Sequence, residues 1–406
     1  MGKCRRLTVD YERKPEHHQA WVQWAMVRVL GKRLTRQAPP LPSRTLGLDT
    51  ASAHKDWAPT RTMARTRRVL VQLVLSPTRI MYSSSRRISL PCARCQDTIL
   101  TVPLEDLPDW LPAWCLDHLG GEPAEVLFQL EQVSMVFGLR LAGGTDVVVK
   151  ARADDGRAVS CVAAQARLAE RGFPCARPLT PVVGVGSLAV HAEEFRPGGE
   201  VLHGDSPDVA VRSAEAFARL MAELAGVTVA PPLPNPPWVR WDHTDSGVWP
   251  AIDCLDNRDQ SAVPAYVVDP AVRARGRLLA ARLPCVLGHA DFEAQNLRWH
   301  GREVWAVHDW DSLAWQPEAA LAGAASGAFA SAGPPTLAPI ESSEAFLVAY
   351  QDIRGRLFTA VEQEIAWAAS LWMAAYNLWE ALHGDTPLSG DALRAQAAER
   401  LRRANA

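Results

Sequence analysis

The chain has 406 residues, of which 48% are hydrophobic and 22% are charged, and its formal net charge is -2. A chain of this length and apolar content can bury one large two-lobed core or two ordinary domains, which excludes a mostly disordered protein. Apolar runs fall short of the roughly 18 residues that a membrane helix needs, so we expect a soluble protein. The 8 cysteines are scattered and no secretory leader is evident, which predicts a reduced, cytoplasmic setting.

Charge is distributed unevenly along the chain. Residues 1–98 carry 19 Lys and Arg against 6 Asp and Glu, whereas the remaining residues carry 24 against 39. The basic stretch lacks a sustained helical or strand period. We interpret residues 1–102 as a poorly patterned extension, either disordered or the product of a mis-assigned start codon. The alternative is a basic arm that binds nucleic acid or an anionic surface.

The patterned region begins near residue 103 with β-rich runs and helices. The expected elements are a short helix through Trp114, Leu116 and Leu119, strands over 126–133, 137–141 and 147–150, a helix over 158–171, and strands within 181–190. Gly120 and Gly121 are typical of a helix stop, and the three strands predict an antiparallel meander. We therefore expect a small α+β lobe over residues 103–193.

A second, mostly helical lobe is expected over residues 194–406. The polar segment 191–199 is rich in Gly and Pro, which predicts a connector between the lobes. Apolar spacing then predicts helices over 209–225 and from 343 to 406. Aromatic residues at helical spacing favour core packing, although a surface that stacks an acceptor is the alternative. These residues are Trp367, Trp372, Tyr376 and Trp379.

Polar residues of two motifs are predicted to converge around a hairpin. The first motif is His289-x-Asp291-x4-Asn296, and the second is Asp309-Trp310-Asp311. The stretches between them are strand-like on either side of a His300-Gly301 turn. If the hairpin pairs symmetrically about that turn, Asp309 lies across from Phe292, beside the first motif.

Such a cluster has the chemistry that phosphoryl transfer needs. A carboxylate accepts or orients the proton of the acceptor hydroxyl, and oxygen ligands hold Mg²⁺ against the nucleotide phosphates. Asp291 suits the first role, whereas Asn296 and Asp309 suit the second. We expect His289 to brace the loop through hydrogen bonds, and His308 to be a hydrogen-bonded strand histidine without a catalytic role.

The two motifs and their spacing resemble the aminoglycoside phosphotransferase family, relatives of the eukaryotic-type protein kinases, over roughly residues 103–400. The resemblance implies an α+β, protein-kinase-like two-lobed fold with a small antiparallel-sheet N-lobe and a mostly helical C-lobe. It implies Asp291 as the catalytic base, Asn296 and Asp309 as ligands of Mg²⁺, and ATP or GTP as the donor. The implied reaction is transfer of the γ-phosphate to a hydroxyl of a small molecule, for example an aminoglycoside-like antibiotic.

The resemblance also extends to the nucleotide. Lys150 ends an apolar strand and resembles the lysine that pairs the α- and β-phosphates. Ser134 lies where a phosphate-covering loop is expected, in residues 133–138, although one glycine there is a weak match. The connector at Glu194, Phe195 and Arg196 is expected to read the nucleobase edge through its backbone.

The helix after Lys150 departs from the family pattern. Where a glutamate is expected to pair with the lysine, the chain has Ser160, Cys161 and Gln165. Gln165 is expected to orient Lys150 by a hydrogen bond without neutralising it. This departure and the single glycine of the expected phosphate loop motivate an alternative hypothesis, a catalytically weak nucleotide-binding protein. A kinase of another small metabolite, such as an amino alcohol, a sugar or a macrolide, also stays open. We expect a small-molecule partner, no membrane or nucleic-acid partner, and a monomer or dimer.

Overall fold

The computed structural model describes residues 103–131, 134–229, 233–252, 263–332, 335–382 and 390–406. All of them belong to one compact unit. The basic extension of residues 1–102 lies outside the described residues, so the predictions made for it stay predictions. Among the described residues, no helix combines the length and apolarity needed to cross a membrane.

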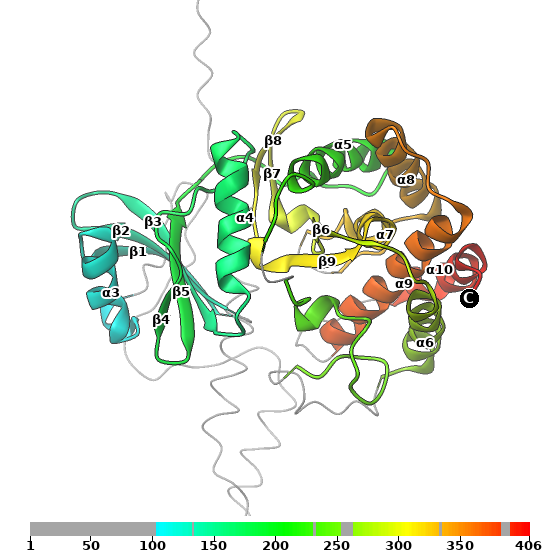
Figure 1. The fold of residues 1–406 in the computed structure, drawn as a ribbon, viewed down its shortest axis with the longest axis horizontal. Helices are drawn as coiled ribbons and strands as arrows, with labels where there is room; N and C mark the ends of the chain where they lie inside the picture. The colour runs from blue at the N-terminus through cyan, green and yellow to red at the C-terminus, as the bar shows by residue number, and fades with distance from the viewer. Residues whose placement is uncertain (1–102, 132–133, 230–232, 253–262, 333–334, 383–389) are drawn as a thin grey trace, which may run out of the picture. The chain divides into compact units, whose positions relative to one another are not determined.

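The N-terminal lobe is built on a five-stranded antiparallel sheet with the order β1-β2-β3-β5-β4. The strands are β1 (Pro123–Glu131), β2 (Met135–Leu141), β3 (Asp146–Ala153), β4 (Val183–Val185) and β5 (Leu188–Glu194). The first three form the meander that the sequence predicts. Two helices, α3 (Trp110–Leu119) and α4 (Ala158–Glu170), lie on opposite faces of this sheet (Figure 1). Gly120, with φ 75°, ends α3 as expected.

The two faces of the sheet differ in chemistry because successive side chains of a strand point to opposite sides. Phe137, Leu139 and Val149 are buried on the face that packs against α3. On β3, Lys150 and Arg152 alternate with these apolar positions and belong to the other face. This second face lies toward α4 and carries the charged side chains of Lys150 and Arg152.

The connector between the lobes starts later than the sequence suggests. Residues from His191 to Glu194 were expected in the connector, but they complete β5 and pair with β3. His191 and Glu193 are buried, so their polarity does not mark a loop. The connector therefore begins at Phe195.

The C-terminal lobe is mostly helical. Its helices are α5 (Pro207–Leu224), α6 (Ala265–Ala280), α7 (Glu318–Ala328), α8 (Ile340–Arg354), α9 (Ala360–Leu382) and α10 (Asp391–Ala404). Helix α9 lies against α6, α7 and α10 (Figure 1). At the α7–α9 crossing, a Cβ on Gly323 would lie 2.1 Å from the Ala366 carbonyl oxygen, so only glycine permits this approach. The expected α+β class, with a small sheet and a mostly helical second lobe, is confirmed.

The aromatic residues of α9 pack in the core, as their helical spacing predicts. Trp249 stacks on Trp379 with ring centroids 5.3 Å apart, and Trp372 stacks on Tyr376. All four are buried. Their arrangement stabilises the lobe through apolar contact and ring packing.

Two short antiparallel ribbons belong to the C-terminal lobe and precede α7 in the chain. Strand β6 (Cys285–His289) pairs with β9 (Leu313–Pro317), and β7 (Leu297–His300) pairs with β8 (Glu303–Val307). The predicted hairpin is present, but its turn is Gly301-Arg302 and not His300-Gly301, because His300 pairs with Glu303 and Gly301 has a left-handed φ of 62°. The expected register was therefore wrong.

Candidate active site

Two backbone hydrogen bonds join the loops of the two motifs. The His308 N–H donates to the Asn296 carbonyl at 2.8 Å, and the Ala290 N–H donates to the Ser312 carbonyl at 2.9 Å. The first bond continues the β7–β8 register past the strands. It places the residues before Asp309 beside Asn296, and not opposite Phe292 as the symmetric hairpin predicted. The three polar side chains of the motifs are therefore carried by adjoining loops.

Asp291 and Asn296 are in direct contact. The Asn296 Nδ2 donates to the Asp291 carboxylate at 3.0 Å and to the Asp291 carbonyl at 2.9 Å. These bonds close the loop of four residues between Asp291 and Asn296 and fix one oxygen of the carboxylate. The amide nitrogen is a hydrogen-bond donor only, so the amide oxygen is the atom of Asn296 that can bind a cation.

His289 is buried and connects the two motif loops. Its Nε2 lies 3.0 Å from the His308 carbonyl, and its Nδ1 accepts from the Asp291 N–H at 3.3 Å. These partners require the neutral tautomer with the proton on Nε2. Burial lowers the pKa of His289 despite the opposing charge of Asp309. The ring thus holds the loop in place in its neutral form.

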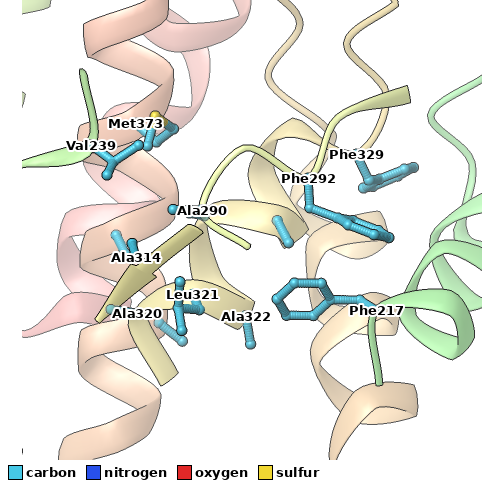
Figure 2. Close-up of a cluster of buried hydrophobic side chains, with 14 of the residues drawn as sticks. Phe217, Val239, Ala290, Phe292, Ala314, Ala320, Leu321, Ala322, Phe329 and Met373 are labelled. Carbon is cyan, nitrogen blue, oxygen red and sulfur yellow. The ribbon is translucent and has the colours of Figure 1, made fainter. Parts of the chain in front are cut away.

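The Asp291 loop is anchored to the core on its other side. The ring of Phe292 lies 4.8 Å from that of Phe217 on α5, in the apolar cluster around Phe329 (Figure 2). Glu293 is buried and accepts from Gln295 and from Asn377 of α9, both at 2.8 Å. Apolar packing and buried hydrogen bonds therefore restrict the backbone on which Asp291 sits.

Asp309 adopts an uncommon backbone conformation, with φ 59° and ψ 51° in the left-handed region. Its carboxylate accepts from the Ser312 hydroxyl at 3.0 Å, and Ser312 in turn accepts from the indole of Trp238 at 3.3 Å. Ser312 is fully buried. Sequence reasoning missed Ser312, although its position three residues after Asp309 is the spacing at which a serine can bond back across a turn.

The donor set fits a magnesium ion that is shared with phosphate. Asn296 and Asp309 offer oxygen atoms, which Mg²⁺ prefers, and few protein ligands are typical of a phosphate-bridging ion. Across the described ranges, no group of three or more His, Cys, Asp or Glu residues could hold a metal ion by itself. A site of this composition needs phosphate or water oxygens to complete it.

Lys150 has a carboxylate partner that sequence reasoning missed. Its Nζ lies 2.9 Å from Oε1 of Glu193 on β5, and both side chains are nearly buried. The Gln165 amide donates to Oε2 of Glu193 at 2.8 Å. The expectation that Lys150 lacks a neutralising partner, and that Gln165 orients it directly, was therefore wrong. The β3–β5 register could have revealed the pair, because Lys150 lies opposite His191 and Glu193 is two residues further along the same face.

The charges of this pair stabilise each other. Burial alone lowers the pKa of Lys150, but Glu193, Asp311 and Asp309 raise it above its ordinary value. Burial alone raises the pKa of Glu193, but Lys150, His191 and Gln165 bring it below its ordinary value. Both groups are therefore ionised at neutral pH.

Two arginines connect the N-terminal lobe to the second motif. Arg152 of β3 lies 3.0 Å from the Asp311 carboxylate, and both side chains are more than 90% buried. Arg157, just before α4, donates to the carbonyls of Asp311 and Leu313 at 2.9 and 2.7 Å. Sequence reasoning gave neither arginine a role, because their partners lie about 150 residues away.

The start of the connector has open backbone donors. Within the described part of the chain, no hydrogen bond engages the N–H of Phe195 or Arg196, whereas the Glu194 N–H donates to the Arg177 carbonyl. Phe128 of β1 lies beside Phe195, with ring centroids 6.0 Å apart. Gly138 is needed there, because a Cβ would lie 2.1 Å from the Phe128 ring.

Two other predicted positions differ from expectation. Residues Met135 to Gly138 of the expected phosphate loop belong to β2, and Val133 lies outside the described residues, so Ser134 alone represents that loop. His308 lies just past β8 and not within a strand. Burial, and to a smaller extent the positive charge of the nearby Arg298, lower the pKa of His308 to about 4. The ring is therefore neutral at physiological pH.

A sequence model of the phosphotransferase enzyme family matches residues 139–338, just under half of the chain. An amicoumacin kinase solved with AMP-PNP and Ca²⁺ is 13% identical, with TM-score 0.49, and the match covers 69% of this chain and 90% of that one. An aminoglycoside phosphotransferase from Alicyclobacillus acidocaldarius subsp. acidocaldarius is 14% identical, with TM-score 0.43, covering 75% and 95%. A choline/ethanolamine kinase family protein from Mesorhizobium loti is 20% identical, with TM-score 0.40, covering 68% and 85%. No curated protein matches the chain.

Proposed function

We propose that the protein transfers the γ-phosphate of ATP or GTP to a hydroxyl group of a small molecule, in keeping with the match of residues 139–338 to the phosphotransferase enzyme family. The observation that carries the proposal is that Asp291, Asn296 and Asp309 lie on loops joined by hydrogen bonds. Phosphoryl transfer depends on positioning and charge stabilisation, and these loops supply both.

Asp291 is proposed as the base. Asn296 holds one of its carboxylate oxygens and so orients the group, and a carboxylate is a group that can accept the proton of the acceptor hydroxyl. A carboxylate with a fixed orientation keeps the attacking oxygen in line with the phosphorus atom. His289 contributes by holding the Asp291 backbone, and it needs no protonation change to do so.

Asn296 and Asp309 are proposed to hold Mg²⁺ through oxygen atoms. When bound, the ion neutralises charge on the β- and γ-phosphates and orients them. Ser312 keeps the Asp309 carboxylate in one rotamer by donating to Oδ2. The left-handed backbone conformation of Asp309 is less unfavourable in energy for aspartate than for most other residues. A strained conformation of this kind agrees with a site that requires one orientation of the side chain.

The nucleotide is proposed to bind between Lys150 and the connector. Lys150 is a protonated cation on the sheet face toward α4 and suits the α- and β-phosphates. The open N–H groups of Phe195 and Arg196 suit the nucleobase edge, with Glu194 supplying a backbone carbonyl and Ser134 a hydroxyl for phosphate. Glu193 supplies the charge that α4 lacks, which answers one reason for the alternative of a catalytically weak binding protein, and the single glycine of the expected phosphate loop is the other.

The acceptor is proposed to be a small hydroxyl compound with cationic groups. The residues after position 98 carry 39 Asp and Glu against 24 Lys and Arg, a balance that attracts cations over the surface. An aminoglycoside-like antibiotic and an amino alcohol both have this chemistry. A cytoplasmic location is part of the proposal, because the reaction needs a nucleoside triphosphate. It also suits the free thiols of Cys115, Cys161, Cys175 and Cys285.

The test combines a binding and a turnover measurement. Thermal stability is measured with ATP or GTP, with and without Mg²⁺, and nucleotide consumption is then followed against aminoglycosides, macrolides and small amino alcohols. We expect a magnesium-dependent rise in melting temperature and consumption with one acceptor class. A shift without consumption would favour the binding-only alternative, and the absence of any shift would contradict a nucleotide site.

Asp291→Ala provides the mechanistic test. It should lower kcat by about 10² to 10⁴-fold, the usual contribution of a general base, while the Kd for Mg·ATP changes by less than about 3-fold. Asp269→Asn on the exposed surface of α6 is the control for loss of a carboxylate. Unchanged turnover in the Asp291 variant would exclude the proposed base.

A further inference from the structure

The carboxylate that pairs with Lys150 comes from a strand of the same sheet, and not from the helix beside it. Glu193 lies on β5, which pairs with β3 in the register Lys150↔His191 and Val148↔Glu193. Lys150 and Glu193 are thus diagonal neighbours on one face, close enough for the 2.9 Å contact. The helix α4 contributes a neutral amide at this point, from Gln165.

Gln165 completes the environment of Glu193. Its Nε2 donates to Glu193 and to the Ala176 carbonyl, both at 2.8 Å. One carboxylate oxygen therefore bonds to Lys150 and the other to Gln165, which satisfies a buried group on both sides. A glutamate at position 165 would instead place a second negative charge beside Glu193. The residue types at 165 and 193 are complementary for this reason.

The neighbouring contacts fix α4 to the C-terminal lobe. Arg157 is 1% exposed, and its guanidinium donates to the carbonyls of Asp311 and Leu313 and also to the Pro234 carbonyl, at 3.1 Å from Nε. A helix held by three backbone acceptors of the other lobe resists rotation away from the sheet. The Lys150–Glu193 pair needs no movement of this helix, because both partners belong to the sheet.

We propose that Glu193 is the positioning residue for Lys150, in the place of the helix glutamate that protein kinases use, and that Gln165 fixes Glu193 through a neutral hydrogen bond. This inference rests on the proposed phosphotransferase function. In this proposal the sheet sets the orientation of the Lys150 side chain, and movement of α4 does not change it. Glu193 acts through Lys150 and does not itself contact the phosphates.

The test compares two substitutions of Glu193 with a matched control. Glu193→Gln keeps the shape and removes the charge, and Glu193→Asp keeps the charge and shortens the reach. Glu318→Gln removes a mostly buried carboxylate, 13% exposed against 4% for Glu193, that is hydrogen-bonded to Tyr350 and Arg354 and lies outside the proposed site. The readouts are kcat and KM for Mg·ATP, with water or a hydroxyl compound that the unaltered enzyme uses as acceptor, and the melting temperature without nucleotide.

We expect Glu193→Gln to lower kcat by about 100-fold and to raise KM for Mg·ATP by less than about 10-fold, because a misplaced lysine loses contacts that matter most in the transition state. Glu193→Asp should recover about 10-fold of that loss, because the charge remains. Glu318→Gln should lower the melting temperature with kcat unchanged.

Three outcomes would overturn the role of Glu193. They are unchanged kcat in Glu193→Gln, equal kcat in the Gln and Asp variants, or a fall in kcat for Glu318→Gln as large as for Glu193→Gln. If Glu193→Gln does not fold, full turnover in Glu193→Asp would overturn it as well. If the unaltered enzyme shows neither turnover nor a shift with Mg·ATP, the proposed function itself fails, which is a distinct result.

Discussion

At the scale of single residues, the candidate site depends on groups that hold the side chains proposed for catalysis and metal binding. Asp309 has a left-handed backbone, and its carboxylate accepts from a buried hydroxyl. Such a conformation persists only where the surroundings determine it. Ser312 contributes twice, since its N–H donates to the Asp309 carbonyl at 3.0 Å and its side chain donates to the carboxylate.

Ser312→Ala should weaken the use of magnesium without preventing folding. Loss of the hydroxyl frees the Asp309 carboxylate to rotate and leaves the Trp238 indole without its acceptor. We expect the Mg²⁺ concentration for half-maximal ATP-dependent stabilisation to rise about 10-fold, the scale seen when a group behind a metal ligand is removed. Thermal shift titration with Mg²⁺ at fixed ATP measures this change.

Ser326→Ala is the control for this prediction. Ser326 is also fully buried, and its hydroxyl bonds to the Gly323 carbonyl within α7. It should cost about 1 kcal/mol of stability, as the loss of an ordinary hydrogen bond does, with an unchanged Mg²⁺ requirement. Equal Mg²⁺ requirements in the two variants would remove Ser312 from the metal site.

At the scale of elements, buried polar contacts connect helices that apolar packing has already brought together. Glu318 begins α7 and accepts from Tyr350 and Arg354 of α8, at 2.7 and 3.2 Å, and from Arg356 just beyond α8. Burial alone raises the pKa of Glu318, but the hydrogen bonds from Tyr350, Arg356 and Arg354 hold it below its ordinary value. The ionised carboxylate therefore stabilises the α7–α8 junction.

Glu318→Gln should lower stability by about 1 to 2 kcal/mol at neutral pH, because two arginines lose a charged acceptor. The folded pKa is depressed, so this contribution is present above the unfolded value near 4.3 and is lost as the pH falls through the folded value. The gap between the unaltered protein and the variant should thus close below about pH 4. Urea unfolding at several pH values measures it, and a gap that widens in acid would contradict the assignment.

At the scale of the whole molecule, the described residues form one unit whose lobes are joined by buried arginines. Arg152 reaches Asp311, and Arg157 reaches the backbone on either side of Ser312. The N-terminal sheet is therefore in contact with the second motif through a buried ion pair, and the residue before α4 through charged hydrogen bonds. These contacts fix how the two parts of the proposed site meet.

Deletion of residues 1–98 should leave this unit intact. The predicted extension lacks the periodicity of a packed element, so we expect the melting temperature to change by less than about 3 °C and the Kd for Mg·ATP by less than about 2-fold. Differential scanning fluorimetry and ATP titration of the truncated protein check this. A large fall in melting temperature would show that the extension contributes to the fold. Salt-dependent nucleic-acid binding that disappears on deletion would support the basic-arm alternative.

Local pattern in the sequence was sufficient for most of the fold. The helix ending at Gly120, the three-stranded meander and the aromatic face of α9 follow from periodicity and turn residues, which act over a few positions. The spacing of Asp291, Asn296 and Asp309 predicted a cluster even though the assumed hairpin register was wrong. The prediction of a cluster does not depend on the exact register, because the two motif loops adjoin the same short β7–β8 ribbon.

The sequence by itself predicted the helix ending at Gly120, the three-stranded meander and the two polar motifs with their spacing, because these depend on neighbours along the chain. The tertiary structure alone decided the partners of the charged groups. Glu193 pairs with Lys150 across two strands that α4 separates in sequence, and Arg152 pairs with Asp311 from another lobe. A buried charge takes whichever partner the packed fold brings within reach, and that distance is set by packing and not by sequence separation.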